Sequence, residues 1–374
     1  RGKHVVVCCN TELTTNVDGV EYIPLVDYDS FVNTYHIDKM IAVNYVDKIN
    51  YEINVKSVYV WLQSMYPIGQ MMWNEKLRGI IALTKFHRNK LKRALASSFH
   101  DLITVICIGV DMSLFIRKNI TKVRRKFIYN SRSVDTLGAV LSVFPKIRAK
   151  YRDAELYVYT DTYTEKQRTF MNQHVYIHVE NRTSNANMAK VLKSCDYWLY
   201  PRQQEKPCSL MAYEVQAAKV CGLTLNTGCI PDILNTRGYE IKLTVDSVLN
   251  VLETLENDLE EKAKRIKEGY DWVMEQQWDD MCDLWEDFFN QRESEYNYFV
   301  VPTTIKQRPV LFTSLKTDLV FSKSLIETGA VLDKLGISNE TFAQGVQLST
   351  KALGMSADEA GQAMLDLSGF AEEL

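Results

Sequence analysis

The sequence predicts an α/β fold built from two doubly wound domains. Short apolar runs alternate along the chain with polar or amphipathic stretches of helix length, from His4 to about Phe289. Several of these runs are apolar at nearly every position, which is typical of strands in a parallel sheet covered on both faces. Regular alternation of strand and helix favours right-handed crossover units. At 374 residues the chain is long enough for two domains, each with its own core.

The first block, residues 1–116, is expected to form one Rossmann-like domain. Its apolar runs predict six strands: His4–Cys9, Val20–Leu25, Met40–Asn44, Val58–Leu62, Ile80–Thr84 and Ile103–Ile108. The basic stretch Lys85–Ser98, between two of these runs, predicts a helix.

The second block, residues 117–268, begins with a charged joint over Arg117–Lys126. Its predicted strands are Lys126–Asn130, Glu155–Thr160, Val175–Val179, Tyr197–Tyr200 and Leu223–Asn226. The helices predicted between them are Asp135–Tyr151, Thr164–Asn172, Asn187–Ser194 and Leu210–Lys219. This order predicts a second doubly wound domain.

The last part of the chain is predicted to be mainly helical. Val245–Leu252 and Asp258–Phe289 have strong helical patterns, and Trp278, Trp285 and Phe289 fall on one helix face. Residues 291–317 lack periodicity and contain prolines, which predicts a linker. Residues 318–374 contain three helical patterns and predict a helical tail, which is either a docking module or a sequence of separate origin.

Composition narrows the functional classes. A net charge of −3 gives no reason to expect a nucleic-acid partner. The eight cysteines include no CxxC pair and no cluster with histidine at metal-ligand spacing, so we expect reduced thiols, no bound metal and a cytoplasmic location. No apolar run approaches the roughly 20 residues that cross a bilayer, and no signal peptide is recognisable. The chain begins at Arg1, which suggests a processed or truncated product.

One stretch carries the clearest chemistry. Asp196–Pro201 predicts a buried strand, and Glu205–Glu214 predicts a short loop that runs into a helix. The unpaired N–H groups at such a helix N-terminus, here Cys208–Leu210, are a usual platform for a phosphate. The Glu214 carboxylate, farther into the helix, can accept hydrogen bonds from sugar hydroxyls. Together they predict a nucleotide-sugar site.

This stretch resembles the donor-binding region of GT-B glycosyltransferases, in the large retaining E-x7-E class (glycosyl transferases group 1). Tyr200-Pro201, Glu214, Ala217-Ala218 and Gly222 match its pattern in order, and Asn226–Asp232 then matches the turn "G-x-x-P-E/D". Glu205 and Glu214 are nine positions apart where the family has eight, so Lys206 stands in the place of the first glutamate. Either Glu205 reaches the site through a one-residue bulge, or its role is lost.

Other segments resemble the same family. Val105–Phe115 is similar to the motif between the two domains, and Ile80–Arg88 is similar to "D-x-I-I-A-L-S-x-F-H-R". These resemblances imply acceptor-side roles for Gln63, which replaces a family histidine, and for His87 and Arg88. The alternative for His87 and Arg88 is a partly structural pair. The first strand resembles the family's second strand, which implies that the acceptor-side domain lacks its opening strand.

For the donor side, the resemblance implies a diphosphate site at Ser131 and Arg132, with Lys206 completing the clamp. Arg132 could equally be a solvated surface arginine. The diphosphate would also meet the helix N-terminus at Cys208, Ser209 and Leu210. The ribose would bind Glu214, and the sugar would lie near Glu205, the implied catalytic residue. Residues 269–290 would form a helix that crosses back to the first domain.

The expected fold is therefore GT-B, with two Rossmann-like domains facing a cleft and a helical C-terminal tail. The expected function is transfer of a sugar, as in hexosyltransferases, from a nucleotide-diphosphate donor to a hydroxyl of a glycan, lipid or protein. By resemblance the reaction would be retaining and metal-independent, with no cofactor. Peripheral membrane contact and docking of another protein by the tail stay open. The alternatives are a non-catalytic nucleotide-sugar-binding or scaffold protein, and a sugar-nucleotide epimerase of the same fold.

Overall fold

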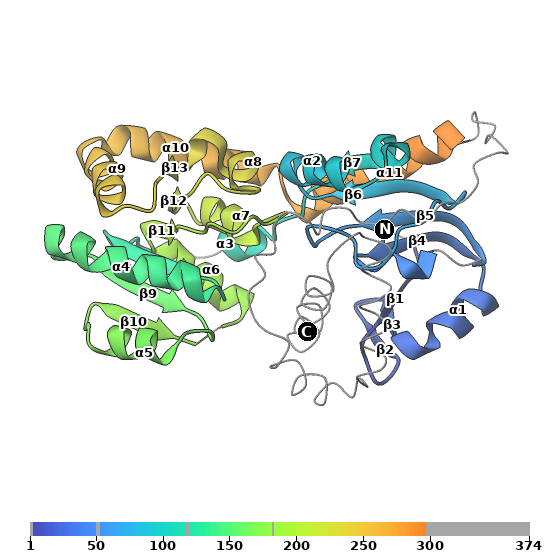
Figure 1. The fold of residues 1–374 in the computed structure, drawn as a ribbon, viewed down its shortest axis with the longest axis horizontal. Coiled ribbons are helices and arrows are strands. Elements are labelled where there is room, and N and C mark those ends of the chain that lie inside the picture. The colour runs from blue at the N-terminus through green and yellow to red at the C-terminus, as the bar shows by residue number, and fades with distance from the viewer. Residues whose placement is uncertain (1–2, 50–52, 117–119, 182, 297–374) are drawn as a thin grey trace, which may run out of the picture. The chain divides into compact units, whose positions relative to one another are not determined.

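A computed structural model describes residues 3–49, 53–116, 120–181 and 183–296 (Figure 1). Contacts divide the chain into two compact units, Arg1–Phe312 and Thr313–Leu374. The second unit, which holds the predicted helical tail, lies outside the described residues, as does most of the predicted linker. The predicted domain boundaries stay predictions.

The first block contains two sheets. A parallel sheet has the strand order β4-β5-β6-β7, with β4 at Ile37–Val43, β5 at Val55–Trp61, β6 at Leu77–Ala82 and β7 at Ile103–Val105. A smaller sheet has the order β1-β3-β2, with β1 at Val5–Cys9, β2 at Thr15–Val17 and β3 at Val20–Pro24. Each predicted strand is present with shifted ends. Strand β2 is not predicted, because its three residues are exposed and form no apolar run.

Short helices connect these strands. They are α1 (Tyr28–Thr34), α2 (Lys85–Ala94), α3 (Ser113–Ile116) and the 3-10 helices Leu25–Asp27, Asp47–Ile49 and Ser97–Leu102. The Thr84 side chain caps α2 by accepting from the His87 N–H. Leu91 of α2 and Phe99 pack in the core on one face of the larger sheet.

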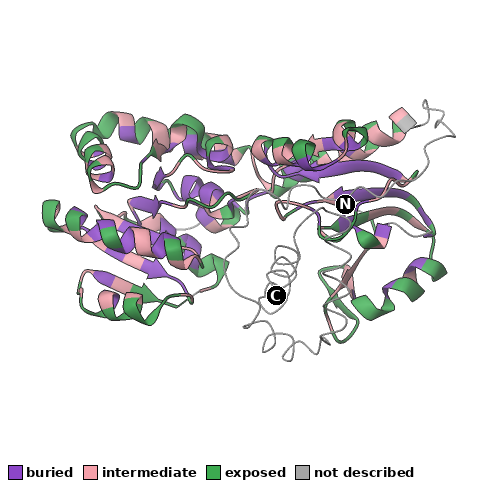
Figure 2. Cartoon of the chain, in the orientation of Figure 1, coloured by how far each residue is buried: buried purple, intermediate pink, exposed green. Residues whose placement is uncertain are grey.

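The other face of that sheet is covered by α11, at Trp278–Tyr296 (Figure 1). Tyr59 of β5 and Ile81 of β6 are buried against Phe288, and the Tyr59 and Phe288 rings meet edge to face at 5.6 Å. Trp61 contacts Trp285 in the same geometry at 5.5 Å. A helix from late in the sequence therefore completes a core begun by the first block. Figure 2 shows that β5 and β6 are largely buried.

The helical stretch predicted over Asp258–Phe289 differs from the structure in two ways. It is divided into α10 (Leu259–Met274) and α11, and α11 continues beyond Phe289 to Tyr296. The extension is held by Arg292, which donates to the Asp101 carbonyl at 2.8 Å and to the Thr104 hydroxyl at 3.1 Å. Such long-range partners are invisible in a search for apolar periodicity.

The second block forms one six-stranded parallel sheet in the order β10-β9-β8-β11-β12-β13. The strands are β8 (Lys126–Asn130), β9 (Glu155–Tyr159), β10 (Ile177–Glu180), β11 (Tyr197–Tyr200), β12 (Cys221–Thr224) and β13 (Tyr239–Glu240). The helices are α4 (Val134–Lys150), α5 (Glu165–Asn172), α6 (Asn185–Ser194), α7 (Leu210–Ala217), α8 (Ile230–Leu234) and α9 (Val245–Asn257), with a 3-10 turn at Asn235–Arg237.

Both faces of this sheet are buried. Along β11, Tyr197 and Leu199 point into the core that α4 and α9 cover, whereas Trp198 and Tyr200 point into the core shared with α6 and α7. Helices on both faces make this block doubly wound, as the sequence predicts. Counted in chain order the strands lie 3-2-1-4-5-6, so the order reverses between β8 and β11. In open parallel sheets, ligands bind at the carboxyl ends of the strands beside such a reversal.

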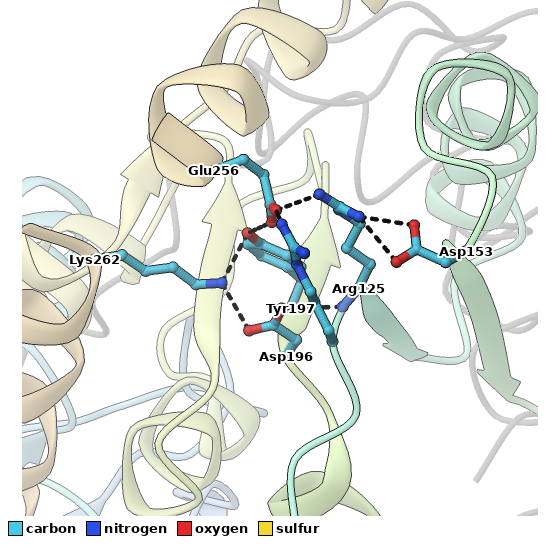
Figure 3. Close-up of polar contacts among 7 residues, drawn as sticks. Arg125, Asp153, Asp196, Tyr197, Glu256 and Lys262 are labelled. Carbon is cyan, nitrogen blue, oxygen red and sulfur yellow. Dashed lines mark hydrogen bonds and ion pairs between the residues drawn. The ribbon is translucent and has the colours of Figure 1, made fainter. Parts of the chain in front are cut away.

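A polar network lies at the opposite, amino ends of the strands (Figure 3). Lys262 of α10 lies 2.7 Å from Asp196, which precedes β11, and 2.8 Å from the Tyr197 hydroxyl. That hydroxyl donates to Glu256 at 2.7 Å. Arg125, which precedes β8, donates to Glu256 at 2.6 Å and to Asp153 at 2.8 Å. The network thereby joins α9 and α10 to the starts of the central strands.

The balance of effects in this network favours the charged form of Glu256. Burial alone would raise the pKa of its carboxyl, but hydrogen bonds from Tyr197 and Arg124, with the charges of Arg125 and Lys262, lower that pKa below its usual value. The contribution of Glu256 to stability is therefore present at neutral pH and is lost as the pH falls through its folded-state pKa.

We expect Lys262→Met to lower the free energy of unfolding by about 3 kcal/mol, because it leaves the Asp196 carboxylate, whose side chain is only 13% exposed, without the cation it pairs with. Urea unfolding of the full chain measures this loss. The matched control is Lys264→Met, two positions along the same helix and on the surface, which should change stability by less than about 0.5 kcal/mol. Equal stabilities of the two variants would contradict a structural role for the network.

Gly109 allows the chain segment that follows β7 to approach the start of α11 closely. A methyl group on Gly109 would lie 2.7 Å from the Trp278 Cα at the start of α11. The adjacent Val110 N–H donates to the Gln276 carbonyl at 2.8 Å, so the backbones are tied together at this point. A side chain here would push α11 away from the chain segment that follows β7.

Gly109→Ala should therefore destabilise the chain by about 1–3 kcal/mol through overpacking against backbone. Gly138→Ala is the matched control, because its added methyl group would meet only the end of the Gln167 side chain at 3.4 Å within a helix. Alanine at that helical position should be neutral or stabilising. Thermal unfolding of both variants tests the comparison.

Candidate functional site

A cavity of about 330 Å³ lies where the strand order reverses. Its walls come from the loop after β8 and the first turn of α4, and from the loop after β11. The lining residues are Ser131, Arg132, Ser133, Val134, Asp135, Arg202, Gln204 and Lys206. Three of these eight side chains are cationic and one is a carboxylate, so the cavity is suited to an anion.

The N-terminus of α4 forms one wall. Ser133 is the N-cap, and its hydroxyl accepts from the Thr136 N–H at 3.3 Å. The Tyr129 hydroxyl donates to the Ser133 carbonyl at 2.7 Å and holds the turn against the sheet. The first-turn N–H groups and the helix dipole favour a negative ligand here, although Asp135 in the same turn opposes one.

The three cations differ in how they are held. Arg202 donates to the Gln204 side chain at 2.9 Å, and Arg132 is largely exposed, 3.8 Å from Asp161. Within the described part of the chain, the Lys206 ammonium has no hydrogen bond or ion pair. Lys206 is exposed at the surface, yet partial desolvation of its ammonium by the surrounding groups, with the nearby Arg202 charge, lowers its pKa. An anion in the cavity would relieve that unfavourable environment.

The backbone of Lys206 is fixed from behind. Its carbonyl accepts from the Cys229 N–H at 3.2 Å. Gly228 has a φ of +60°, and a methyl group there would lie 2.8 Å from the Lys206 nitrogen. The turn before α8 can approach the loop this closely only because position 228 is glycine.

Glu214 lies on α7, outside the residues that line the cavity. Its carboxylate is half-buried, and within the described residues it forms no hydrogen bond or ion pair. Burial raises its pKa. A half-buried carboxylate needs hydrogen-bond donors, and the hydroxyl groups of a bound ligand could supply them.

The other residues predicted for the donor side lie apart from the cavity lining. Ser209 is the N-cap of α7 and is buried, but its side chain makes no cap hydrogen bond. Burial raises the pKa of Cys208 to about 12, so its thiol is neutral. Leu210 is half exposed. Glu205, predicted as catalytic, pairs with Lys90 of α2 at 2.5 Å and does not line the cavity.

The three predicted acceptor-side residues differ in burial and in their hydrogen-bond partners. His87 is fully buried, and its ring bridges the Leu83 N–H at 3.2 Å and the Met65 carbonyl at 3.1 Å. Arg88 is half-buried, and its Nε has no hydrogen-bond partner in the described residues. Gln63 is exposed, with its backbone N–H donating to Asn44 at 2.7 Å. Both ring nitrogens of His87 are thus hydrogen-bonded to the protein backbone.

Arg202 and Gln204 line the cavity but are not among the predicted site residues. The available signal was a run of polar residues directly after the buried strand Tyr197–Tyr200, at the carboxyl end where ligands bind. Among the described residues, no group of three or more His, Cys, Asp or Glu side chains could hold a metal ion. No helix in that part of the chain is long and apolar enough to cross a membrane.

Comparison with solved structures identifies the fold. Sucrose-phosphate synthase from Thermosynechococcus elongatus is similar, with a TM-score of 0.61 at 10% identity over 79% of this chain and 90% of that chain. The GtfA/B complex is similar with a TM-score of 0.52 at 10% identity, over 64% of this chain and 54% of that one. HepE from Anabaena, solved with UDP-glucose, has a TM-score of 0.50 at 10% identity, over 64% and 72%.

These similarities show that the chain has the GT-B fold predicted from its sequence. The chain spans only about half the length of the GtfA/B chain that it matches. No protein-family model and no curated protein sequence matches the chain. The E-x7-E class and the missing opening strand therefore stay predictions.

His87 should make stability depend on pH. Burial lowers the pKa of His87 to about 4 from the usual 6.5, only partly offset by backbone hydrogen bonds. The unfolded chain thus binds a proton at a pH where the folded chain does not, so stability is complete above pH 6.5 and falls between pH 6.5 and 4. The total loss should be about 3 kcal/mol.

Urea unfolding at a series of pH values tests this dependence in wild type and in His87→Gln, which keeps a side chain able to donate and accept. The variant should lose most of the slope between neutral and acidic pH. His36→Gln, a change on the exposed surface, is the control and should keep it. A slope that survives in His87→Gln would assign the effect to another group.

Proposed function

We propose that the chain binds a nucleotide-diphosphate sugar and transfers the sugar to a hydroxyl acceptor. The observation that carries this proposal is the cavity where the strand order reverses, with Arg132, Arg202 and Lys206 beside the N-terminus of α4. Cations around a helix N-terminus suit a diphosphate because they supply both full charges and oriented N–H donors.

The same groups would act on the reaction. In the transfer, the bond from the anomeric carbon to the diphosphate oxygen breaks and a bond to the acceptor oxygen forms, while the acceptor proton passes to the departing diphosphate. Negative charge grows on that diphosphate as the bond breaks. Fixed cations and N–H dipoles that face it stabilise the transition state more than the ground state.

Glu214 is the proposed partner for the ribose hydroxyls of the donor. Its half-buried carboxylate, which has no partner within the described residues, supports this role, as does its match to the family glutamate. The bound UDP-glucose of HepE belongs to that protein, and it supports the class of ligand proposed for this chain. The resemblance alone adds three further points to the proposal: a hexosyl donor, retention of configuration, and independence from metals and other cofactors. A cytoplasmic location is proposed from the cysteine usage.

One observation favours a second candidate, a nucleotide-sugar-binding protein without transfer activity. Glu205, the implied catalytic residue, is engaged by Lys90 and does not line the cavity. Gln63, in the place of a family histidine, cannot carry a proton at neutral pH. Binding without transfer would distinguish this candidate from the first.

Calorimetric titration of the full chain with UDP, GDP and ADP tests the donor site. One nucleotide should bind with micromolar affinity. Lys206→Met should weaken its binding by roughly tenfold, because it removes a cavity cation that has no partner among the described residues. Glu214→Ala should weaken it by more than about 1 kcal/mol. Lys242→Met, an exposed lysine outside the cavity, is the control and should bind like wild type.

The absence of binding by all three nucleotides, or binding unaffected by Lys206→Met, would contradict the proposed site. If one nucleotide binds, a transfer assay with the sugar donors of that base follows. Sugar transfer to an acceptor supports the enzyme, and binding without turnover supports the second candidate.

A further inference from the structure

The loop between β11 and α7 makes contacts in two directions. Gln204 and Lys206 line the cavity of the second block. Glu205 lies between them in sequence, yet its carboxylate reaches Lys90 on α2 of the first block at 2.5 Å. The two side chains of this pair are 21% and 41% exposed, so the contact is partly shielded from water. Glu205, the residue next to Lys206 in sequence, is therefore bound to the other block.

Two more contacts join α2 to the same region. The Thr84 hydroxyl, at the N-cap of α2, donates to the Pro207 carbonyl at 2.9 Å. The Phe86 N–H, in the first turn of α2, donates to the Asp232 carboxylate of α8 at 2.6 Å. The turn before α8 holds the Lys206 carbonyl through the Cys229 N–H. The neighbours of Lys206 on both sides, Glu205 and Pro207, therefore contact α2 directly. The turn that holds the Lys206 carbonyl leads into α8, which contacts α2 through Asp232.

We propose that Lys90 is a positioning residue for the cavity, and that it acts through Glu205 to hold Lys206 in place. This inference rests on the proposed function, because it takes the ligand of the cavity to be a nucleoside diphosphate. Lys90 does not touch that ligand. It fixes the loop segment whose next residue supplies the cation, and it does so from the opposite block of the fold.

The arrangement links ligand binding to the docking of the two blocks. If the Lys90–Glu205 contact improves the position of Lys206, then a diphosphate on Lys206 must strengthen the contact by the same factor, since coupling between sites is reciprocal. Glu205 is then a member of the contact between blocks and not a group that acts on the sugar. This account explains why its carboxylate does not line the cavity.

The test uses the full chain and whichever of UDP, GDP or ADP binds. Lys90→Met should weaken nucleotide binding by roughly fivefold, the lower end of usual coupling between sites. Adding Glu205→Gln to Lys90→Met should cause no further loss. The exchanged pair Lys90→Glu with Glu205→Lys should return to within about twofold of wild type. Lys92→Met, an exposed lysine on the same helix, is the control and should bind like wild type.

Hydrogen–deuterium exchange provides a second readout that needs no nucleotide. Lys90→Met should speed exchange in the segments 83–91 and 203–209 together, and Lys92→Met should affect neither. In wild type, bound nucleotide should slow exchange in 83–91, a segment outside the cavity. A merely local role of Lys90 in α2 would leave segment 203–209 unchanged.

The outcomes separate the two proposals. If wild type binds no nucleotide, the proposed function fails, and exchange alone shows whether Lys90 holds the loop. If nucleotide binds and Lys90→Met changes neither affinity nor exchange at 203–209, the positioning role is overturned. If the double variant loses much more affinity than Lys90→Met, Glu205 contacts the ligand itself and the role assigned to it here is wrong.

Discussion

The ion pair of Lys262 with Asp196 is the interaction on which the second block depends most. It fixes α10 to the start of β11, and through Tyr197 and Glu256 it also fixes α9 and the start of β8. Charges at the amino ends of the strands are therefore mutually satisfied. At the carboxyl ends, Lys206 and Glu214 have no hydrogen-bond or ion-pair partner among the residues that the structure describes. A sheet anchored firmly at one edge can hold unpaired groups in place at the other.

The strands of the second block were predictable because their residues are apolar at almost every position. The limits of β8 and β11 agree with the apolar runs at Lys126–Asn130 and Tyr197–Tyr200. The site was harder to predict. Lys206 was recognised through the family pattern, but the partner of Glu205 is Lys90, in a distant part of the sequence. Only the fold brings such residues together, and no spacing rule indicates it.

His87 and Arg202 show the same limit of local sequence. His87 reads as a polar residue that begins a helix, yet folding buries its ring against the backbone of two loops. Arg202 reads as an ordinary loop arginine, yet the parallel strand order places it at the wall of a cavity. The burial of a side chain and the direction in which it points depend on how the chain packs. Local sequence can therefore suggest a chemical group without showing what that group faces.

The position of α11 has a consequence for how the chain folds during synthesis. Ile81 and Tyr59 are buried by Phe288, which the ribosome adds more than 200 residues after either of them. Until α11 emerges, one face of the first sheet has no cover, and its apolar side chains are exposed to water and to other nascent chains. Contacts this distant in sequence form late. The first block can thus finish folding only after the ribosome has translated α11, which follows the second block. A ribosome that stalls before Phe288 would release an aggregation-prone intermediate.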